Sequence, residues 1–220
     1  MKENVTRRSF LATAGVAALG AGVAKAAEGM GKPVKIIGVA CSPRKGMTTA
    51  KAVQAALDAA KVVDPRITVE LIDLGGLSIA GYSPQPPQDD FAAILPKLQN
   101  PAVGGLILGS PAYFRGMSAL CKAFIERCAP LREPKMVLAN KPVGVVAVGA
   151  FRNGGQEMTI EQIQAAMLCF GMIAVGGNAP AFQGATVLST KDDISADTLG
   201  LDTAKKLGAH LAEMALKLTA

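Results

Sequence analysis

The stretch Val34 to Thr49, VKIIGVACSPRKGMTT, constrains the fold of this chain more than any other. An apolar run typical of a buried strand passes through a short hydroxyl- and cation-bearing loop into an alanine-rich helical pattern. The first N–H groups of a helix have no partner within it, and the helix dipole favours negative charge there. The loop therefore predicts an anion site, in which the hydroxyls of Ser42, Thr48 and Thr49 and the guanidinium of Arg44 contact a phosphate. An ordinary strand-to-helix turn is the alternative interpretation of this loop taken alone.

Strand and helix patterns alternate through the rest of the chain. The expected strands after the first are 67–74, 103–108, 143–148 and 172–175, and the expected helices are 49–62, 91–98, 118–128, 157–170 and 196–218. The apolar runs VGGLIL and VGVVAV indicate strands that are covered on both faces. This alternation predicts an α/β fold, with a doubly wound, five-stranded parallel sheet and helices on both faces. Ligands of such sheets bind at the carboxyl ends of the strands.

Two further loops follow predicted strands at that edge. One presents Tyr113 and Phe114, and Gly116 allows a close backbone approach beside them. In the other, Gly154 and Gly155 can bring backbone N–H groups against a flat polar ring. A phosphate site, an aromatic surface and backbone donors together describe a mononucleotide site, and a flavin fits it best. The alternative is that Tyr113 and Phe114 are plain core residues.

Three segments carry a resemblance to known families: CSPRKGMTT, GSPAYFRGMSALCKAFIERC and RNGGQE. In this order they resemble signatures of the NADPH-dependent FMN reductase and iron–sulfur flavoprotein families, over roughly residues 35–177. The resemblance implies a flavodoxin-like fold with sheet order 2-1-3-4-5. It also implies an FMN-dependent oxidoreductase that uses NAD(P)H as donor and a quinone, free flavin or metal ion as acceptor.

The resemblance also implies which residues hold the FMN. Those for the phosphate are Ser42, Arg44, Thr48 and Thr49; those along the ring are Pro111, Ala112, Tyr113, Phe114 and Gly116; those on its other side are Ala150, Arg152, Gly154 and Gly155. No residue is assigned as catalytic, because the cofactor carries the chemistry.

The cysteines depart from the iron–sulfur pattern. Iron–sulfur flavoproteins carry a compact cysteine cluster in the loop after the second strand, whereas the corresponding loop 75–90 has no cysteine. The cysteines of this chain show no CxxC spacing. We therefore expect no iron–sulfur cluster and no other metal site. Cys121 and Cys128 would lie about 10 Å apart on one helical face, which favours core packing. Cys41, where the family usually has glycine, is either packed or a redox-active thiol.

The N-terminal segment resembles an export signal. TRRSFLA is similar to the twin-arginine motif, and an A-x-A site follows at Ala24 to Ala26. We therefore expect a signal peptide over 1–27, an FMN-binding domain over 28–220, and a periplasmic protein without a membrane span after cleavage. An uncleaved anchor or a disordered tail is the alternative.

The charge distribution argues against a nucleic-acid partner. The formal net charge is +6, but residues 1–27 hold four basic residues and one acidic residue, leaving 19 basic and 16 acidic residues in the rest. No basic stripe with interleaved aromatics remains. The expected partners are a small-molecule electron donor and acceptor, a redox protein as a further candidate, and a second copy of the chain.

Two other functions stay open from the sequence. One is a flavodoxin-like electron carrier without its own substrate site, and the other is a periplasmic binding or assembly protein that has lost the flavin. Because nicotinamide dinucleotides are scarce outside the cytoplasm, a quinol or a cytochrome is an alternative donor.

Overall fold

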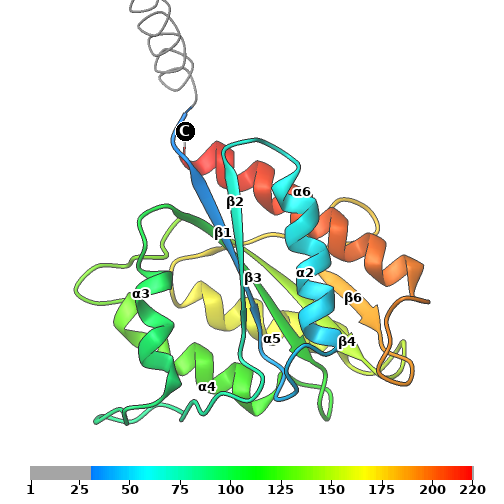
Figure 1. Cartoon of the computed structure of the whole chain (residues 1–220), viewed down its shortest axis with the longest axis horizontal. Helices are drawn as coiled ribbons and strands as arrows, with labels where there is room; N and C mark the ends of the chain where they lie inside the picture. Colours follow the sequence, from blue (N-terminus) through cyan, green and yellow to red (C-terminus); the bar gives the residue numbers. More distant parts are fainter. Residues whose placement is uncertain (1–30, 220) are drawn as a thin grey trace, which may run out of the picture. The chain divides into compact units, whose positions relative to one another are not determined.

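A parallel β-sheet lies at the centre of the computed structural model, which describes residues 31–219 (Figure 1). The strands are β1 (Val34–Ala40), β2 (Ile67–Asp73), β3 (Val103–Pro111), β4 (Pro142–Gly149), β5 (Ile173–Ala174) and β6 (Ala185–Leu188). Their order is β2-β1-β3-β4-β5, and β6 also pairs with β4. This confirms the predicted flavodoxin-like α/β fold and its strand order. The predicted signal peptide lies outside the described residues.

The edge beyond β4 is the part of the sheet that the sequence analysis described incompletely. β5 pairs only with Pro142 and Val143, and β6 pairs with the stretch Val146–Gly149 further along the same strand. Between them the chain turns away at Gly176, where a Cβ atom would lie 1.7 Å from the carbonyl oxygen of Phe182. Two short strands therefore share the fifth position, and the sheet has six strands rather than five.

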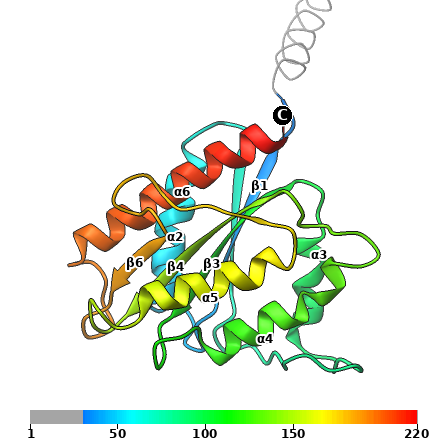
Figure 2. The same cartoon turned by 180° about the vertical axis from the view of Figure 1, so that it is seen from behind.

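Helices cover both faces of the sheet (Figures 1 and 2). The elements on one face are α2 (Thr48–Lys61) and α6 (Thr198–Thr219); those on the other are α4 (Ala119–Arg127), α5 (Gln156–Leu168), the 3-10 turns η1 (Asp90–Ala93) and η2 (Ala129–Leu131), and α3 (Leu95–Leu98). The helix expected over 91–98 is thus a 3-10 turn followed by one short α-helix. Each face has its own buried apolar cluster, and β3 is buried along its whole length between them.

The carboxyl ends of the parallel strands meet at one edge, which is the lower edge of the sheet in Figure 1. α2 begins there directly after the loop that follows β1, and α4 and α5 begin after the loops that follow β3 and β4. The fold therefore brings together the three loops singled out in the sequence.

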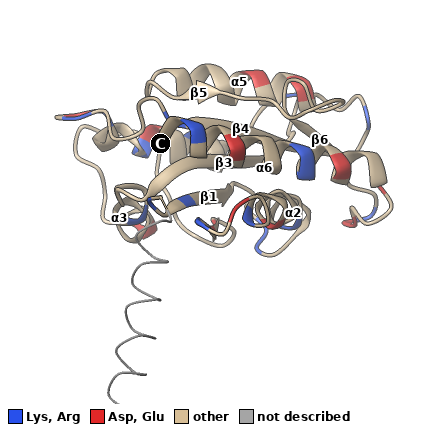
Figure 3. Cartoon of the chain, turned by 90° about the horizontal axis from the view of Figure 1, so that it is seen from above, with Lys and Arg blue, Asp and Glu red and all other residues tan. Residues whose placement is uncertain are grey.

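Charged residues are spread over the helices rather than gathered on one face (Figure 3). Along α6, for example, Asp202 and Glu213 alternate with Lys205, Lys206 and Lys217. None of the helices within residues 31–219 is both long and apolar enough to span a membrane.

Candidate functional site

A serine-centred hydrogen-bond network fixes the ends of β1 and β3 beneath the site. Ser118, the N-cap of α4, accepts a hydrogen bond from the Cys121 N–H at 3.0 Å and donates one to the Cys41 carbonyl oxygen at 2.6 Å. The Ser110 hydroxyl accepts from the Ser118 N–H at 3.0 Å and donates to the Pro111 carbonyl oxygen at 2.9 Å. Both serines are buried, so these bonds are formed away from competing water.

The N-terminus of α2 opens into a cavity of about 300 Å³ at this edge. Met47, the N-cap residue, makes no side-chain capping bond, and the first turn of α2 contains no acidic residue. Thr48 and Thr49 are almost fully buried and line the cavity together with Arg44. Free helix N–H groups, two hydroxyls and a guanidinium are the donor set that a phosphate requires.

The loop after β3 contributes an aromatic wall to the same cavity. Backbone hydrogen bonds of 2.9 and 3.0 Å join Tyr113 to Gly116, so Phe114 and Arg115 form a two-residue turn. Both turn residues have positive φ, 50° and 66°. Such angles are uncommon for residues other than glycine and concentrate at functional sites. Tyr113 lines the cavity and is half-exposed, while Phe114 is fully exposed, so the structure does not support the core interpretation of these two residues.

A second cavity, of about 330 Å³, lies beside the start of α5. Gly155 has a φ of +95°, and a Cβ atom there would lie 2.6 Å from the Cα of Arg115, so glycine lets the loops after β3 and β4 touch. Arg152 and Gln156 also line this cavity. Within residues 31–219, the Gln156 side-chain oxygen is the one buried side-chain N or O atom without a hydrogen-bond partner. A buried acceptor of this kind is costly unless a ligand N–H, an O–H or a water satisfies it.

Arg152 is not a free cation. It forms an ion pair with Asp197, whose carboxylate also accepts from the Leu188 N–H at 2.6 Å and the Gly200 N–H at 3.1 Å. Burial alone would raise the pKa of Asp197. The bond from Arg152 and the two backbone bonds outweigh burial and lower the pKa. The carboxylate therefore stays ionised and holds Arg152 against the start of α6.

The predicted site residues fall into three groups. Those that line the first cavity are Arg44, Thr48, Thr49, Pro111, Ala112, Tyr113 and Ala150. Those that line the second are Arg152 and Gly155. Ser42, Phe114, Gly116 and Gly154 line neither, although the Ser42 hydroxyl shapes the phosphate loop by accepting from the Arg44 N–H at 3.2 Å. Their assignment to a flavin stays a prediction.

Residues that follow β6 also line the first cavity, although no sequence motif pointed to them. Ser189, Lys191 and Asp192 follow β6 directly and line the cavity, as do Val148 and Gly149 at the end of β4. The Asp192 carboxylate lies 2.7 Å from the Arg44 guanidinium. The available signal was ATVL followed by the polar turn STKDD, a short strand pattern that ends in turn residues.

Cys41 packs as a core residue. It is fully buried, and its burial, followed by its contact with Cys121, raises the pKa of its thiol well above the usual value. The environment thus opposes the thiolate that a redox-active cysteine needs. Among residues 31–219, no three His, Cys, Asp or Glu side chains lie where they could share a metal ion. The absence of an iron–sulfur cluster stays a prediction.

Together, the fold and the two cavities define a flavodoxin-like protein in which an uncapped helix N-terminus lies beside polar loops. The model of the NADPH-dependent FMN reductase family matches residues 34–187, so the chain belongs to that family. Membership places it among FMN-dependent oxidoreductases.

Two relatives align with this chain over most of their length. The chain is 40% identical to the iron-sulfur flavoprotein MJ1083 of Methanocaldococcus jannaschii, over 82% of this chain and 97% of the relative. It is 33% identical to the iron-sulfur flavoprotein of Methanosarcina thermophila, over 79% of this chain and 93% of the relative.

Solved structures agree on the fold. The structure of RosB with the bound intermediate 8-demethyl-8-formylriboflavin-5'-phosphate superposes with a TM-score of 0.65 at 14% identity, covering 84% of this chain and 81% of that one. A WrbA-like flavodoxin from Agrobacterium tumefaciens gives a TM-score of 0.57 at 18% identity, covering 84% and 99%.

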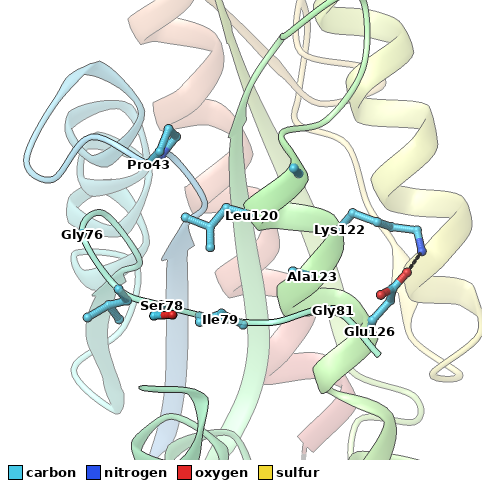
Figure 4. Close-up of a pocket in the computed structure, with 11 residues that line it drawn as sticks. Pro43, Gly76, Ser78, Ile79, Gly81, Leu120, Lys122, Ala123 and Glu126 are labelled. Atoms are coloured by element: carbon cyan, nitrogen blue, oxygen red, sulfur yellow. Dashed lines mark hydrogen bonds and ion pairs between the residues drawn. The ribbon is translucent and has the colours of Figure 1, made fainter. Parts of the chain in front are cut away.

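The loop between β2 and η1, residues 75–90, is held by carboxylates instead of cysteines. Asp89 accepts from the Ala80 N–H at 3.0 Å and pairs with Arg127, and Glu126 accepts from the Tyr82 N–H at 2.8 Å. The loop and α4 line a groove of about 840 Å³ that begins at Pro43, in the loop after β1 (Figure 4). Within residues 31–219, hydrogen bonds and an ion pair made by these two carboxylates therefore close the loop.

Proposed function

We propose that this protein is an FMN-binding oxidoreductase that reduces a quinone, a flavin or a metal ion at the expense of NAD(P)H or a quinol. The observation that carries the proposal is the 300 Å³ cavity, where one edge of the sheet combines an uncapped helix N-terminus, Arg44 and the Tyr113 loop. Family membership supports the choice of FMN over other phosphorylated ligands.

The residues present fit FMN at both ends. Thr48, Thr49, Arg44 and the first N–H groups of α2 would hold the phosphate, and the loops after β3 and β4 would hold the ring. The unpaired Gln156 oxygen provides an acceptor for a ring N–H. When bound, FMN supplies hydride and single-electron transfer.

The protein itself would bind the flavin, orient its ring and leave space for a substrate beside it. The Ser110–Ser118 network holds the loops that carry Pro111 and Cys41 in fixed positions. The second cavity, beside Arg115, gives a donor or acceptor room next to the ring loops, which favours a reductase over a carrier without a substrate site. The Arg115 guanidinium, which donates to the Met158 sulfur at 3.3 Å, lines this cavity and can face an anionic substrate.

The proposal includes export and assembly. The twin-arginine route carries folded proteins, so FMN would be inserted before export to the periplasm, and a second copy of the chain is a candidate for completing the ring site. Replacing Arg7 and Arg8 by lysine tests the route. Export should stop, and continued appearance of the protein in the periplasmic fraction would contradict this part of the proposal.

Flavin titration of wild type and Arg44→Gln tests the cofactor site. Because a charge-assisted bond to phosphate is lost, we expect FMN to bind roughly 10- to 100-fold more weakly, and riboflavin to be affected by less than about threefold. Flavin fluorescence gives both affinities. Arg66→Gln, which removes the same charge from an ion pair with Asp64 outside the cavity, is the matched control and should bind FMN like wild type.

Failure of the wild type to bind FMN would contradict the proposal, as would an equal loss for FMN and riboflavin in Arg44→Gln. Reduction of the bound flavin by NADPH, NADH or a quinol under anaerobic conditions then identifies the donor.

A further inference from the structure

The turn after β6 lies across the phosphate cavity in a strained conformation. Backbone hydrogen bonds of 2.8 and 3.0 Å join Thr190 to Asp193, so Lys191 and Asp192 form a two-residue turn. Both have positive φ, 51° and 61°. Aspartate adopts this conformation more readily than most residues, but it is uncommon for lysine, and the two backbone bonds hold both residues in it. The turn places Asp192 at the first cavity, where its carboxylate meets Arg44.

That carboxylate engages the residue on which phosphate binding depends. Asp192 Oδ1 accepts a hydrogen bond from Arg44 Nη1 at 2.7 Å, and both residues line the cavity with Thr48 and Thr49. The bond raises the pKa of Arg44, and Tyr113 adds to the effect. The Asp192 carboxylate is therefore already bound to the Arg44 guanidinium. Both groups lie beside the helix N-terminus at which the phosphate would bind.

We propose that Asp192 is an internal competitor of the flavin phosphate for Arg44, so that FMN binds only by exchanging this ion pair and remains readily dissociable. The inference rests on the proposed function and deepens it, because it concerns how the same site holds its cofactor. The chemistry recognised is a phosphate monoester, which carries more negative charge than a carboxylate and can accept several hydrogen bonds from the α2 N-terminus.

Exchange is feasible because the pair is only half-buried. The side chains of Arg44 and Asp192 are 47% and 52% exposed. Ion pairs at such exposure contribute little net stability, so a stronger ligand can displace the carboxylate. Until it does, the fraction of protein with a free Arg44 limits the apparent affinity for FMN, and the nearby carboxylate repels the phosphate.

The test measures FMN and riboflavin affinity, and the FMN dissociation rate, in Asp192→Asn and Asp193→Asn. Asparagine tolerates the left-handed conformation, so Asp192→Asn removes the charge and keeps the turn. Asp193 is the matched control because its carboxylate accepts from the Ser195 N–H and hydroxyl and does not line the cavity.

We expect Asp192→Asn to bind FMN roughly 3- to 10-fold more tightly and to release it correspondingly more slowly, with riboflavin affinity within about twofold of wild type. Asp193→Asn should match wild type for both ligands.

Weaker or unchanged FMN binding in Asp192→Asn overturns the inference, because the carboxylate would then orient Arg44 or have no effect. An equal gain in Asp193→Asn also overturns it, because the effect would be general charge. If folded wild type binds no FMN, the proposed function itself fails. These outcomes separate the two claims, because the inference alone fails only when wild type binds FMN normally.

Discussion

Asp197 shows how one buried carboxylate organises the second cavity. It pairs with Arg152, caps the start of α6 through the Gly200 N–H, and accepts from the Leu188 N–H at the end of β6. The loop after β4, the end of β6 and the start of α6 therefore depend on one side chain. Since both backbone N–H groups would lose their partner together, this residue is a stronger determinant of stability than a surface ion pair.

Asp197→Ala should lower the free energy of unfolding by about 2–3 kcal/mol, the sum of a lost helix cap and an unsatisfied buried N–H. Urea unfolding followed by circular dichroism measures it. The control is Asp202→Ala on the same helix, which removes an exposed pair with Lys206 and should cost less than about 1 kcal/mol. Equal small losses in the two variants would mean that Asp197 is not the organising residue.

At the scale of elements, α2 and α6 cross in close contact over the sheet. A Cβ atom at Gly208, in the middle of α6, would lie 1.9 Å from the Ala56 carbonyl oxygen of α2. Glycine in a helix interior usually costs stability, by about 1 kcal/mol relative to alanine. Here the missing side chain lets two backbones approach, so the position is set by packing rather than by helix propensity.

Gly208→Ala is therefore expected to destabilise the protein by about 2 kcal/mol or more, opposite in sign to the gain that helix propensity predicts. The free energy of unfolding in urea decides the sign. Glu213→Ala, on the same helix at an exposed position, should change it by less than about 0.5 kcal/mol. A more stable Gly208→Ala protein would show that the two helices can separate without cost.

Local patterns explain which elements could be predicted from the sequence. β1, its loop and α2 are contiguous, so periodicity and the polar loop between them define the phosphate half of the site. β6 has only four residues, and its place beside β4 depends on how the chain returns after Gly176. The contact between Arg44 and Asp192 spans 148 positions, and no local pattern predicts it.

At the scale of the whole molecule, one edge of the sheet carries every feature that argues for a cofactor. Both cavities, the uncapped start of α2 and the two strained turns lie at the carboxyl ends of β1, β3, β4 and β6. The loop over 75–90 contains no cysteine and is closed by the ion pair between Asp89 and Arg127. We therefore propose a flavin at this edge, and the absence of an iron–sulfur centre stays a prediction.

The visible absorption spectrum of the purified, folded protein, read together with the identity of the released cofactor and its iron content, tests this claim most directly. We expect a flavin spectrum that appears on isolation or on addition of FMN, release of FMN on denaturation, and no stoichiometric iron. A colourless protein that fails to take up added FMN would contradict the cofactor assignment, and stoichiometric iron with acid-labile sulfide would contradict the predicted absence of a cluster.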